Sequence, residues 1–513
     1  MLVSHIECFP RDGGPPTLSR VIPQQHEDEA LLRRLGYKQD LSRRMSGFSN
    51  FAISLSIICI LAGGITSFHV GLCSVGGASM GLGWPLACLF SMAVAATMAQ
   101  VASAFPTAGG LYHWASILGG RACGWVTAWF NLTGLIAVLG AVNAGTYDFA
   151  SAAFGFSVPE QHAALVKTVV VVFMTLTHAL LNHYGIRLTT RLTDLSGYLI
   201  LGVATVLTVA LLMNTQHFEW ARLWTFANYS GLPEAAAVFP KQQSLIWLFC
   251  LGLLLPAYTI TGFDASAHTS EETIGAAHNV PRGIVRSVLA SALFGWVMIC
   301  AILLAMPNVA EGVGKGSEAV AWTIKSALPS WLAWGLLGGI VLAQYFCGLA
   351  ALTSASRMTY AFARDGGLPW SEYLGKTSPI SKTPTYAIWA TGTLGAIFTI
   401  LVPYTTIAAV CTVLLYISYV IPVGAGFLTF GKSWTRMGPW QLGSWYRPLA
   451  LVAALGCVFL IVIGMQPPNE QAVWIVGTVV FLLLVIWFGL ERKRFKGPPQ
   501  VDLGGLPEKS AVS

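Results

Sequence analysis

Charged residues are scarce in this sequence, and that scarcity decides the class of protein before any motif is considered. Only 10% of the residues are charged and 55% are hydrophobic, whereas an ordinary soluble domain carries roughly 25% charged residues. No polar block is long enough to form a separate soluble domain. The composition therefore predicts a protein that lies within a lipid bilayer.

The sequence also lacks the motifs of metal sites, disulfide frameworks and membrane-embedded enzymes. The ten cysteines are scattered, mostly within apolar segments, and no two of them form a CxxC pair, so neither a disulfide framework nor a zinc site is indicated. There is no HExxH helix, no nucleophile with its base and no pair of acids deep in an apolar segment. We therefore expect no catalytic residue, no metal site and no cofactor.

Long apolar segments are what the sequence does contain. A helix needs about 20 apolar residues to cross a hydrocarbon core of about 30 Å. Twelve segments approach this length, near residues 49–72, 84–104, 123–151, 164–183, 192–213, 244–270, 285–306, 331–356, 384–402, 405–429, 446–465 and 471–490. They predict an all-α membrane protein with twelve transmembrane helices.

Lysine and arginine predict the orientation of these helices. If the amino terminus is cytoplasmic, 24 of the 29 basic residues lie in cytoplasmic segments, as the positive-inside rule requires for an even number of spans. The net charge of +7 then reflects topology and anionic lipid, because the basic residues are spread over many loops. We expect a multi-pass plasma-membrane protein with lipid around it, both termini in the cytoplasm and no nucleic-acid partner.

The two ends of the chain are predicted to be cytoplasmic tails, residues 1–46 and 491–513. Residues 1–40 mix proline, glycine and charge without a helical period, and residues 497–513 are similarly poor in apolar surface. Such segments cannot offset their ordering entropy, so we assign them no fold. In the loop 307–330, residues 319–327 predict a short amphipathic helix that acts as a lid.

The first apolar segment is interrupted by small residues, namely Ala62, Gly63, Gly64 and Ile65. A glycine turn lets the backbone approach a ligand closely. Amide groups at the start of the following half-helix, together with its positive dipole, favour a carboxylate. The alternative is a close crossing of two helices through small residues.

A second interruption runs from Pro256 to Asp264. It contains Tyr258, Thr259, Thr261 and Gly262, which we predict to bind substrate together with the first turn. Unpaired backbone groups in hydrocarbon cost several kcal/mol each, so they persist only where they line a cavity or bind something. Two interrupted helices in matching positions of two halves are typical of a secondary transporter.

Asp264 is an acid beyond the middle of its apolar segment, where a carboxylate costs at least about 2.5 kcal/mol. The alternatives for its compensation are protonation, a substrate ammonium group, a cation, or hydrogen bonds from Thr259 and Thr261. A coupling or gating role is one reading of Asp264, and capping of the next half-helix is the other. Tyr258 either stacks on a cationic amine and closes the cavity or packs in the ordinary way.

Three separated motifs carry a resemblance to a known family. They read GFDASAHTSEET at 262–273 with NVPRGI at 279–284, SAFPTAGGLY at 103–112, and SRMTYAFARDGGLP at 356–369. These motifs resemble those of amino acid permeases in the amino acid, polyamine and organocation superfamily. The residues of these motifs are most similar to those of the amino acid/choline transporter branch, which includes γ-aminobutyrate (GABA) and choline permeases. The similarity extends from about residue 35 to 490.

The resemblance implies a transporter domain at 47–490 with the five-plus-five inverted repeat of the LeuT type. Repeat one covers about 49–213 and repeat two about 244–429. Helices 1 and 6 are broken, and two peripheral helices cover about 446–490. The resemblance also implies alternating access around a midplane site, with the turn at 62–65 on the substrate carboxyl and Tyr258 near a gating aromatic. Asp264 stands where many relatives carry glutamate.

The resemblance bears on the gate as well. Glu271 and Arg364 fall inside the motifs, and we predict that they form an inner gate of ion pairs with Glu272, Arg282, Arg357 and Asp365. The alternative is a set of solvated loop charges, each worth at most about 1 kcal/mol.

The coupling ion and the substrate remain open between several alternatives. Thr353 and Ser354 resemble a hydroxyl pair that completes a sodium site, although such hydroxyls more often bond to their own helix. The resemblance favours proton symport over sodium symport and exchange. A small amino acid or amine, above all a GABA-like zwitterion, fits a carboxylate-binding turn beside an acid better than choline does. A polyamine permease and, from other classes, a channel or a membrane enzyme are the further alternatives.

Overall fold

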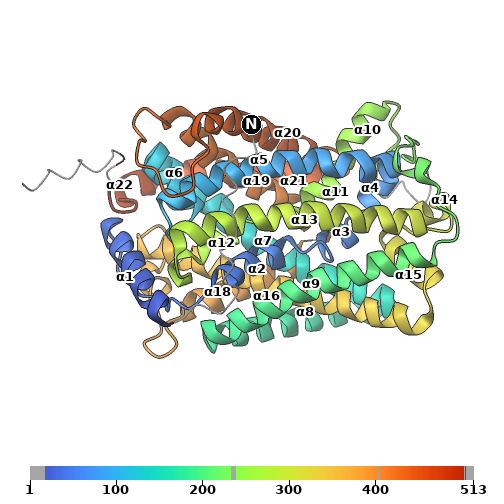
Figure 1. Ribbon diagram of the computed structural model, residues 1–513, viewed down its shortest axis with the longest axis horizontal. Coiled ribbons are helices and arrows are strands. Elements are labelled where there is room, and N and C mark those ends of the chain that lie inside the picture. The colour runs from blue at the N-terminus through green and yellow to red at the C-terminus, as the bar shows by residue number, and fades with distance from the viewer. Residues whose placement is uncertain (1–17, 157, 233–237, 403, 502, 504–513) are drawn as a thin grey trace, which may run out of the picture.

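The chain folds into a bundle of helices whose long axes run side by side (Figure 1). The computed structural model describes residues 18–156, 158–232, 238–402, 404–501 and 503, and across these residues it contains no β-strand. The longest apolar helices are α5 (Trp84–Ala104), α7 (Arg121–Phe154), α8 (Glu160–His183), α9 (Ile186–Asn214), α13 (Ala276–Ala305), α16 (Ser330–Arg364), α18 (Thr385–Leu401), α19 (Tyr404–Thr429), α20 (Tyr446–Gly464) and α21 (Glu470–Ile486).

These helices have the length and composition of membrane spans. Ten helical stretches in the described part of the chain are long and apolar enough to cross a bilayer, and two shorter apolar stretches are Leu245–Thr259 and Thr385–Leu401. Each of the twelve predicted segments overlaps one of these stretches. The all-helical fold and its apolar helices are those of a multi-pass membrane protein.

The first predicted segment is interrupted, as expected, but the interruption begins earlier than predicted. It separates α2 (Gly47–Ile58) from α3 (Gly63–Thr66) and α4 (Phe68–Val75), so that residues 59–62 are non-helical. The carbonyl oxygen of Cys59 accepts hydrogen bonds from the amides of Ala62 and Gly63 at 2.7 and 3.0 Å. This tight turn ends α2 early, and Gly63 therefore opens the next half-helix.

The second predicted segment divides into α10 (Leu245–Gly252), α11 (Leu254–Thr259) and α12 (Ala265–His268). Pro256 lies inside α11 rather than in the gap. Proline has no N–H for the carbonyl of Gly252, so the helix divides at Leu253 instead of ending. The non-helical residues are 260–264. Gly262 adopts a φ of +81° there, a conformation that glycine tolerates far better than other residues.

The two interruptions face each other in the bundle. Half-helix α3 packs against α11, and α2 packs against α12. A β-carbon added to Gly63 would lie 2.7 Å from the Cα atom of Thr259. The close crossing through small residues is therefore present, and it brings together the two non-helical stretches of backbone.

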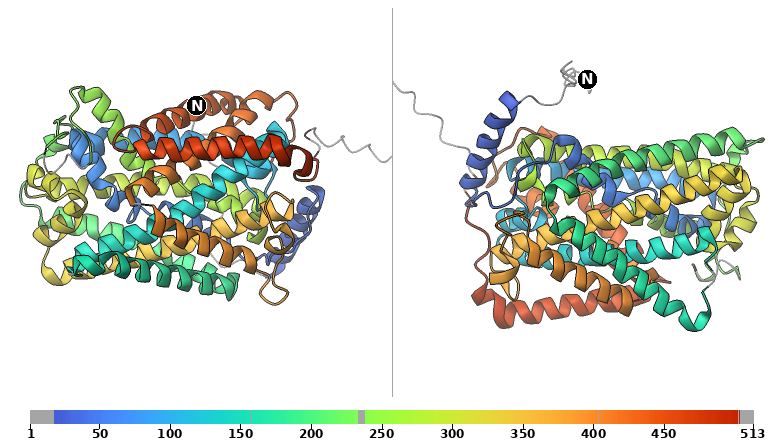
Figure 2. Two further views of the ribbon diagram at one scale, coloured as in Figure 1. Left: turned by 180° about the vertical axis from the view of Figure 1, so that it is seen from behind. Right: turned by 90° about the horizontal axis from the view of Figure 1, so that it is seen from below.

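The bundle has two ends, which we call the terminal end and the distal end. The terminal end carries α1 (Leu18–Arg34), α6 (Leu111–Gly119) and α22 (Arg492–Arg494), and the distal end carries α14 (Val309–Gly314) and α15 (Ala319–Ala327). Figure 2 shows from two further sides that α1 and α22 lie at the same end. Helix α15 has the predicted bounds, and its action as a lid stays a prediction.

The prediction that residues 1–40 have no fold is wrong for residues 18–40. They contain α1 and a segment that packs on the terminal end, with Leu32 and Leu35 buried. The Asp28 carboxylate accepts hydrogen bonds from the amides of Gly275 and Ala276 at 2.7 and 3.0 Å, at the start of α13. The segment is stabilised by the surface it covers, which its own composition does not reveal. Residues 1–17 and most of 502–513 lie outside the described residues.

Candidate functional site

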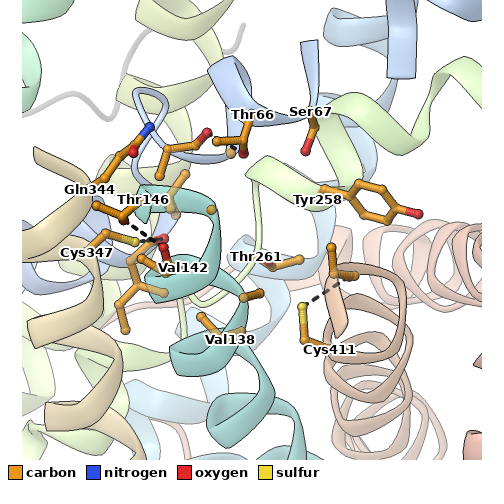
Figure 3. Close-up of a pocket in the computed structure, with 17 residues that line it drawn as sticks. Thr66, Ser67, Val138, Val142, Thr146, Tyr258, Thr261, Gln344, Cys347 and Cys411 are labelled. Carbon is orange, nitrogen blue, oxygen red and sulfur yellow. Dashed lines mark hydrogen bonds between the residues drawn. The ribbon is translucent and has the colours of Figure 1, made fainter. Parts of the chain in front are cut away.

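A cavity of about 60 Å³ lies between the two interruptions (Figure 3). Its wall comes from α2, α3, α7, α11, α16 and α19, together with residues of both interruptions. This volume is several times the roughly 10–15 Å³ that a cavity needs to hold one water molecule. The cavity therefore suits a small solute.

One wall of the cavity is a face of α7. Val138, Ala141, Val142, Gly145 and Thr146 all line it. Residues at this spacing share one side of a helix, so α7 presents a stripe of small and medium side chains to the solute. Sequence reasoning missed these residues because most of them are small or apolar and do not stand out within a long apolar segment.

Half of the predicted substrate residues line the cavity. They are Ala62, Gly63, Tyr258 and Thr261. Gly64 and Ile65 directly follow the lining residues, and their amide groups have no hydrogen-bond partner within the described part of the chain. These free amides lie at the start of α3, where a carboxylate was predicted to bind.

The other two predicted substrate residues have structural contacts instead. The hydroxyl of Thr259 donates to the carbonyl of Leu255 at 2.8 Å. The amide of Gly262 donates to the hydroxyl of Tyr419 at 2.9 Å. Neither residue is part of the cavity wall.

The cavity wall carries no charge. Among the described residues that line it there is no Asp, Glu, Lys, Arg or His. Its polar side chains include Thr66, Ser67, Thr146 and Gln344. In Figure 3, Gln344 and Cys347 of α16 lie on one side of the cavity, and Tyr258 and Cys411 lie on the other. Of these, only Tyr258 was predicted from the sequence.

Asp264 lies outside the cavity wall and is fully buried. Its Oδ2 atom accepts a hydrogen bond from Asn131 at 2.8 Å and lies 3.1 Å from Nε2 of His268, and its Oδ1 atom accepts one from Tyr419 at 2.8 Å. Thr259 and Thr261 give it no hydrogen bond, and its side chain does not cap α12. The acid is compensated by three side chains that the sequence analysis did not name for this purpose.

The hydrogen bonds fix how many protons this cluster holds. Nδ1 of His268 lies 3.1 Å from the carbonyl oxygen of Ala108, which only accepts, so Nδ1 carries a hydrogen. The contact between Nε2 and Asp264 then needs one more proton, on the imidazole or on the carboxyl group. In either arrangement the pair shares this proton and is neutral overall.

A chain of contacts leads from this pair to the terminal end. The amide of Ala108 donates to Glu271 at 3.1 Å. Arg364 donates to both carboxylate oxygens of Glu271, at 2.8 and 3.0 Å. Burial by itself raises the pKa of Glu271, but the Arg364 guanidinium outweighs it and the pKa lies below its usual value. The predicted pair is therefore a buried ion pair and not two solvated loop charges.

Further charges of the predicted inner gate gather nearby. Glu272 and Arg357 form a second fully buried bidentate pair, at 3.0 and 3.1 Å. Asp365 accepts hydrogen bonds from Tyr37 and Tyr112, and its contact with His113 lowers its pKa although burial alone raises it. Arg282 is the exception to the prediction, because it lies exposed on α13.

Replacing Glu271 by glutamine leaves the Arg364 guanidinium without its carboxylate in a buried position. Breaking such a pair costs about 3–5 kcal/mol, so we expect a clear fall in the thermal unfolding midpoint of the detergent-purified protein. The matched control is Glu311→Gln, which removes an exposed ion pair to Lys315 at 4.0 Å. Equal midpoints for the two variants would contradict the structural weight given to Glu271.

The two hydroxyls of the possible cation site differ in their surroundings. The hydroxyl of Thr353 lies 2.8 Å from the carbonyl of Leu349 in its own helix and 2.9 Å from the Asn182 amide oxygen. That oxygen also accepts from the Arg357 guanidinium at 3.0 Å. The hydroxyl of Ser354 is buried and has no partner in the described part of the chain. Thr353 thus makes the back-bond that was the alternative to a cation.

A second cavity of about 70 Å³ adjoins the first on the other side of Tyr258. Thr66, Ser67 and Tyr258 line both cavities. The amide group of Asn469, in the connection between α20 and α21, donates to the Tyr258 hydroxyl at 2.9 Å. Tyr258 therefore stands between two compartments, and its ring is held from outside the interrupted helices.

Comparisons with known proteins agree with this geometry. A family described as "Amino acid permease" matches residues 45–490. The amino-acid permease BAT1 of Arabidopsis thaliana is 32% identical over 512 residues, which cover 93% of this chain and 97% of the relative. The GABA-specific permease of Saccharomyces cerevisiae is 27% identical, with 94% of this chain and 88% of the relative covered.

Proposed function

Because this chain belongs to the amino acid permease family, we propose that it carries a small zwitterionic amino acid across the membrane by secondary active transport. Access to the cavity alternates between the two sides of the membrane. The observation that carries this proposal is the cavity between two facing interruptions. Interrupted helices at membrane depth are the sites where transporters bind substrate and coupling ion.

The charge-free wall supports a substrate with no net charge. A zwitterion such as GABA brings its own balanced charges, and free amides at Gly64 and Ile65 suit its carboxylate. Choline and polyamines are net cations, and the described cavity wall offers them no acid. A relative of this chain is named a GABA-specific permease, which is why GABA is the first amino acid to test.

The proposed architecture has twelve spans, with repeat one at about 49–213, repeat two at about 244–429 and peripheral helices at about 446–490. We place the terminal end in the cytoplasm and the protein in the plasma membrane. The distribution of lysine and arginine supports this orientation. The buried ion pairs of Glu271 and Glu272 then form an inner gate, which is closed in this conformation.

We place proton coupling at Asp264 and His268. With the shared proton the pair is neutral, and release of that proton leaves one negative charge on it, so the loaded form is the one that costs less in the membrane. Sodium coupling has less support. Unwound carbonyls and the C-terminal ends of half-helices are the usual ion ligands of broken helices. Here the carbonyls of Ile57, at the end of α2, and Leu61, in the first interruption, are bonded by Cys347 and Gln344 at 3.3 and 3.0 Å. Thr353 and Ser354 remain the residues to test for a cation.

The test is uptake by the purified protein in proteoliposomes with an imposed proton gradient. A thermal-shift screen of amino acids, amines and choline first selects the substrate. We expect saturable accumulation of an amino acid that collapses when a protonophore is added and persists when sodium is replaced by potassium. Empty liposomes are the control.

Four outcomes would change the proposal. Uptake that needs sodium would move the coupling site to Thr353 and Ser354, and uptake only against internal amino acid would make the protein an exchanger. Current that does not saturate at low substrate would favour a channel. Stabilisation by choline or a diamine but by no amino acid would overturn the substrate class.

A further inference from the structure

Gln344 is a polar side chain in the middle of α16 with no role yet in substrate recognition. It is 1% exposed and lines the cavity. Its Nε2 atom donates a hydrogen bond to the carbonyl of Leu61 at 3.0 Å. Leu61 belongs to the first interruption, so Gln344 satisfies a carbonyl that the broken helix leaves open.

The other end of the same carboxamide has no partner. Oε1 of Gln344 is buried and accepts no hydrogen bond within the described part of the chain. The assignment of the two atoms is fixed by Leu61, because the reversed amide would set two oxygens against each other. A buried acceptor without a donor is costly, and a bound solute that supplies a donor removes that cost.

We propose that Oε1 of Gln344 accepts a hydrogen bond from the substrate ammonium group, while Nε2 holds the turn at Leu61. This inference rests on the proposed function and specifies how it recognises an amine. Asp264, the acid first considered for that role, lies outside the cavity wall and has its own three partners. Within the described cavity wall, an uncharged carboxamide therefore replaces a carboxylate.

The neutral character of this acceptor sets the selectivity. The free amides of Gly64 and Ile65 take the carboxylate, and Gln344 takes the ammonium group, so a zwitterion is bound at both charges without a net charge in the site. A diamine has a second ammonium group in place of the carboxylate, and at Gly64 and Ile65 this group meets N–H donors, which repel it. Hydrogen bonds to a charged group are stronger than neutral ones, so both contacts help the site to bind a zwitterion in preference to a diamine.

The two roles of Gln344 also connect substrate and backbone. An ammonium group on Oε1 polarises the carboxamide and strengthens the bond from Nε2 to Leu61, because linked hydrogen bonds reinforce one another. Substrate binding in the cavity therefore stabilises the backbone of the first interruption at Leu61. Cys347, one turn along α16, bonds the carbonyl of Ile57 but offers no second acceptor of this kind.

The experiment compares ligands with and without the amine on the wild-type protein and on Gln344→Met and Gln344→Glu. Each protein is titrated with GABA and the standard amino acids, and with the matching carboxylic acids that lack the amine, such as butyrate for GABA. The matched controls are Gln441→Met and Gln441→Glu, at an exposed glutamine in the connection before α20. Thermal unfolding checks that every variant is folded.

We expect Gln344→Met to weaken binding of the amino acid at least tenfold. The affinity for the amine-free acid should stay within twofold of the wild type. Gln344→Glu keeps the volume and an acceptor, adds a negative charge and replaces the Nε2 donor to Leu61 by an oxygen. The ammonium group of 1,4-diaminobutane can lie against that carboxylate, so the diamine should compete for binding in this variant and not in the wild type. This gain of binding keeps the test decisive if the methionine variant is unstable.

Two results would overturn the inference. One is an equal loss of affinity for the amino acid and for the amine-free acid in Gln344→Met, which would mean that Gln344 only holds the turn at Leu61. The other is a folded Gln344→Glu that still excludes the diamine. Failure of the wild-type protein to bind any amino acid would instead refute the proposed function, so the two failures are told apart by the wild-type titration.

Discussion

Gly63→Leu is expected to abolish substrate binding while the protein still inserts into the membrane, and Gly63→Ala is expected to weaken binding by about 5- to 150-fold. The reason is the contact between the two interrupted helices. A β-carbon at Gly63 would lie 2.7 Å from the Cα atom of Thr259 and 3.1 Å from its Oγ1 and Cβ atoms. Backbone cannot rotate away as a side chain can, so α3 and α11 must separate, at a cost of about 1–3 kcal/mol for one methyl group.

Binding is measured by isothermal titration or thermal shift with the amino acid selected in the initial screen. The control is Gly202→Ala on α9, where an added β-carbon would have no atom within 4 Å. Gel filtration in detergent shows whether each variant is folded. Wild-type affinity in a folded Gly63→Ala would mean that the close crossing does not shape the site.

Asp264→Asn is expected to lose gradient-driven accumulation and to keep exchange of external for internal substrate. Asparagine cannot take up or release the proton that Asp264 shares with His268, but its carbonyl oxygen can still accept from Tyr419. The Oδ1 atom of Asn131 has no partner among the described residues. If the Asn131 amide rotates by half a turn, this oxygen can accept a hydrogen bond from the new amide group. The variant therefore stays folded, and the loss is one of coupling.

The measurement is the ratio of internal to external substrate in proteoliposomes with an inward proton gradient, together with counterflow without a gradient. We expect a ratio near one for Asp264→Asn, with counterflow retained. His268→Gln should behave in the same way, because the exchangeable proton belongs to the pair. Unchanged accumulation in either variant would remove the pair from the coupling mechanism.

The sequence predicts the apolar segments well because their signal is local. Each of the twelve segments overlaps an apolar helical stretch of the structure, and both interruptions were predicted from glycine and proline. Their bounds moved by a few residues for local reasons. The turn at Cys59 starts the first gap early, and Pro256 divides a helix rather than ending it.

The partners of the buried groups were less predictable. His268 follows Asp264 by four residues, which is a visible spacing on one helix face, but that spacing was not used. Asn131 and Tyr419 lie 133 and 155 residues away in the chain, and only the packed bundle brings them together. Gln344 was detectable as a strongly polar residue within an apolar segment.

The tightness of the α3–α11 crossing has a consequence for redesign of this protein. Since that side of the cavity is backbone against backbone, it offers no room to enlarge or reduce the space for cargo. The stripe of α7 that ends at Thr146 offers side chains instead. Substitutions meant to change the transported solute should therefore begin with Val138 and Val142. Smaller side chains at these two positions would enlarge the cavity and leave both interruptions unchanged.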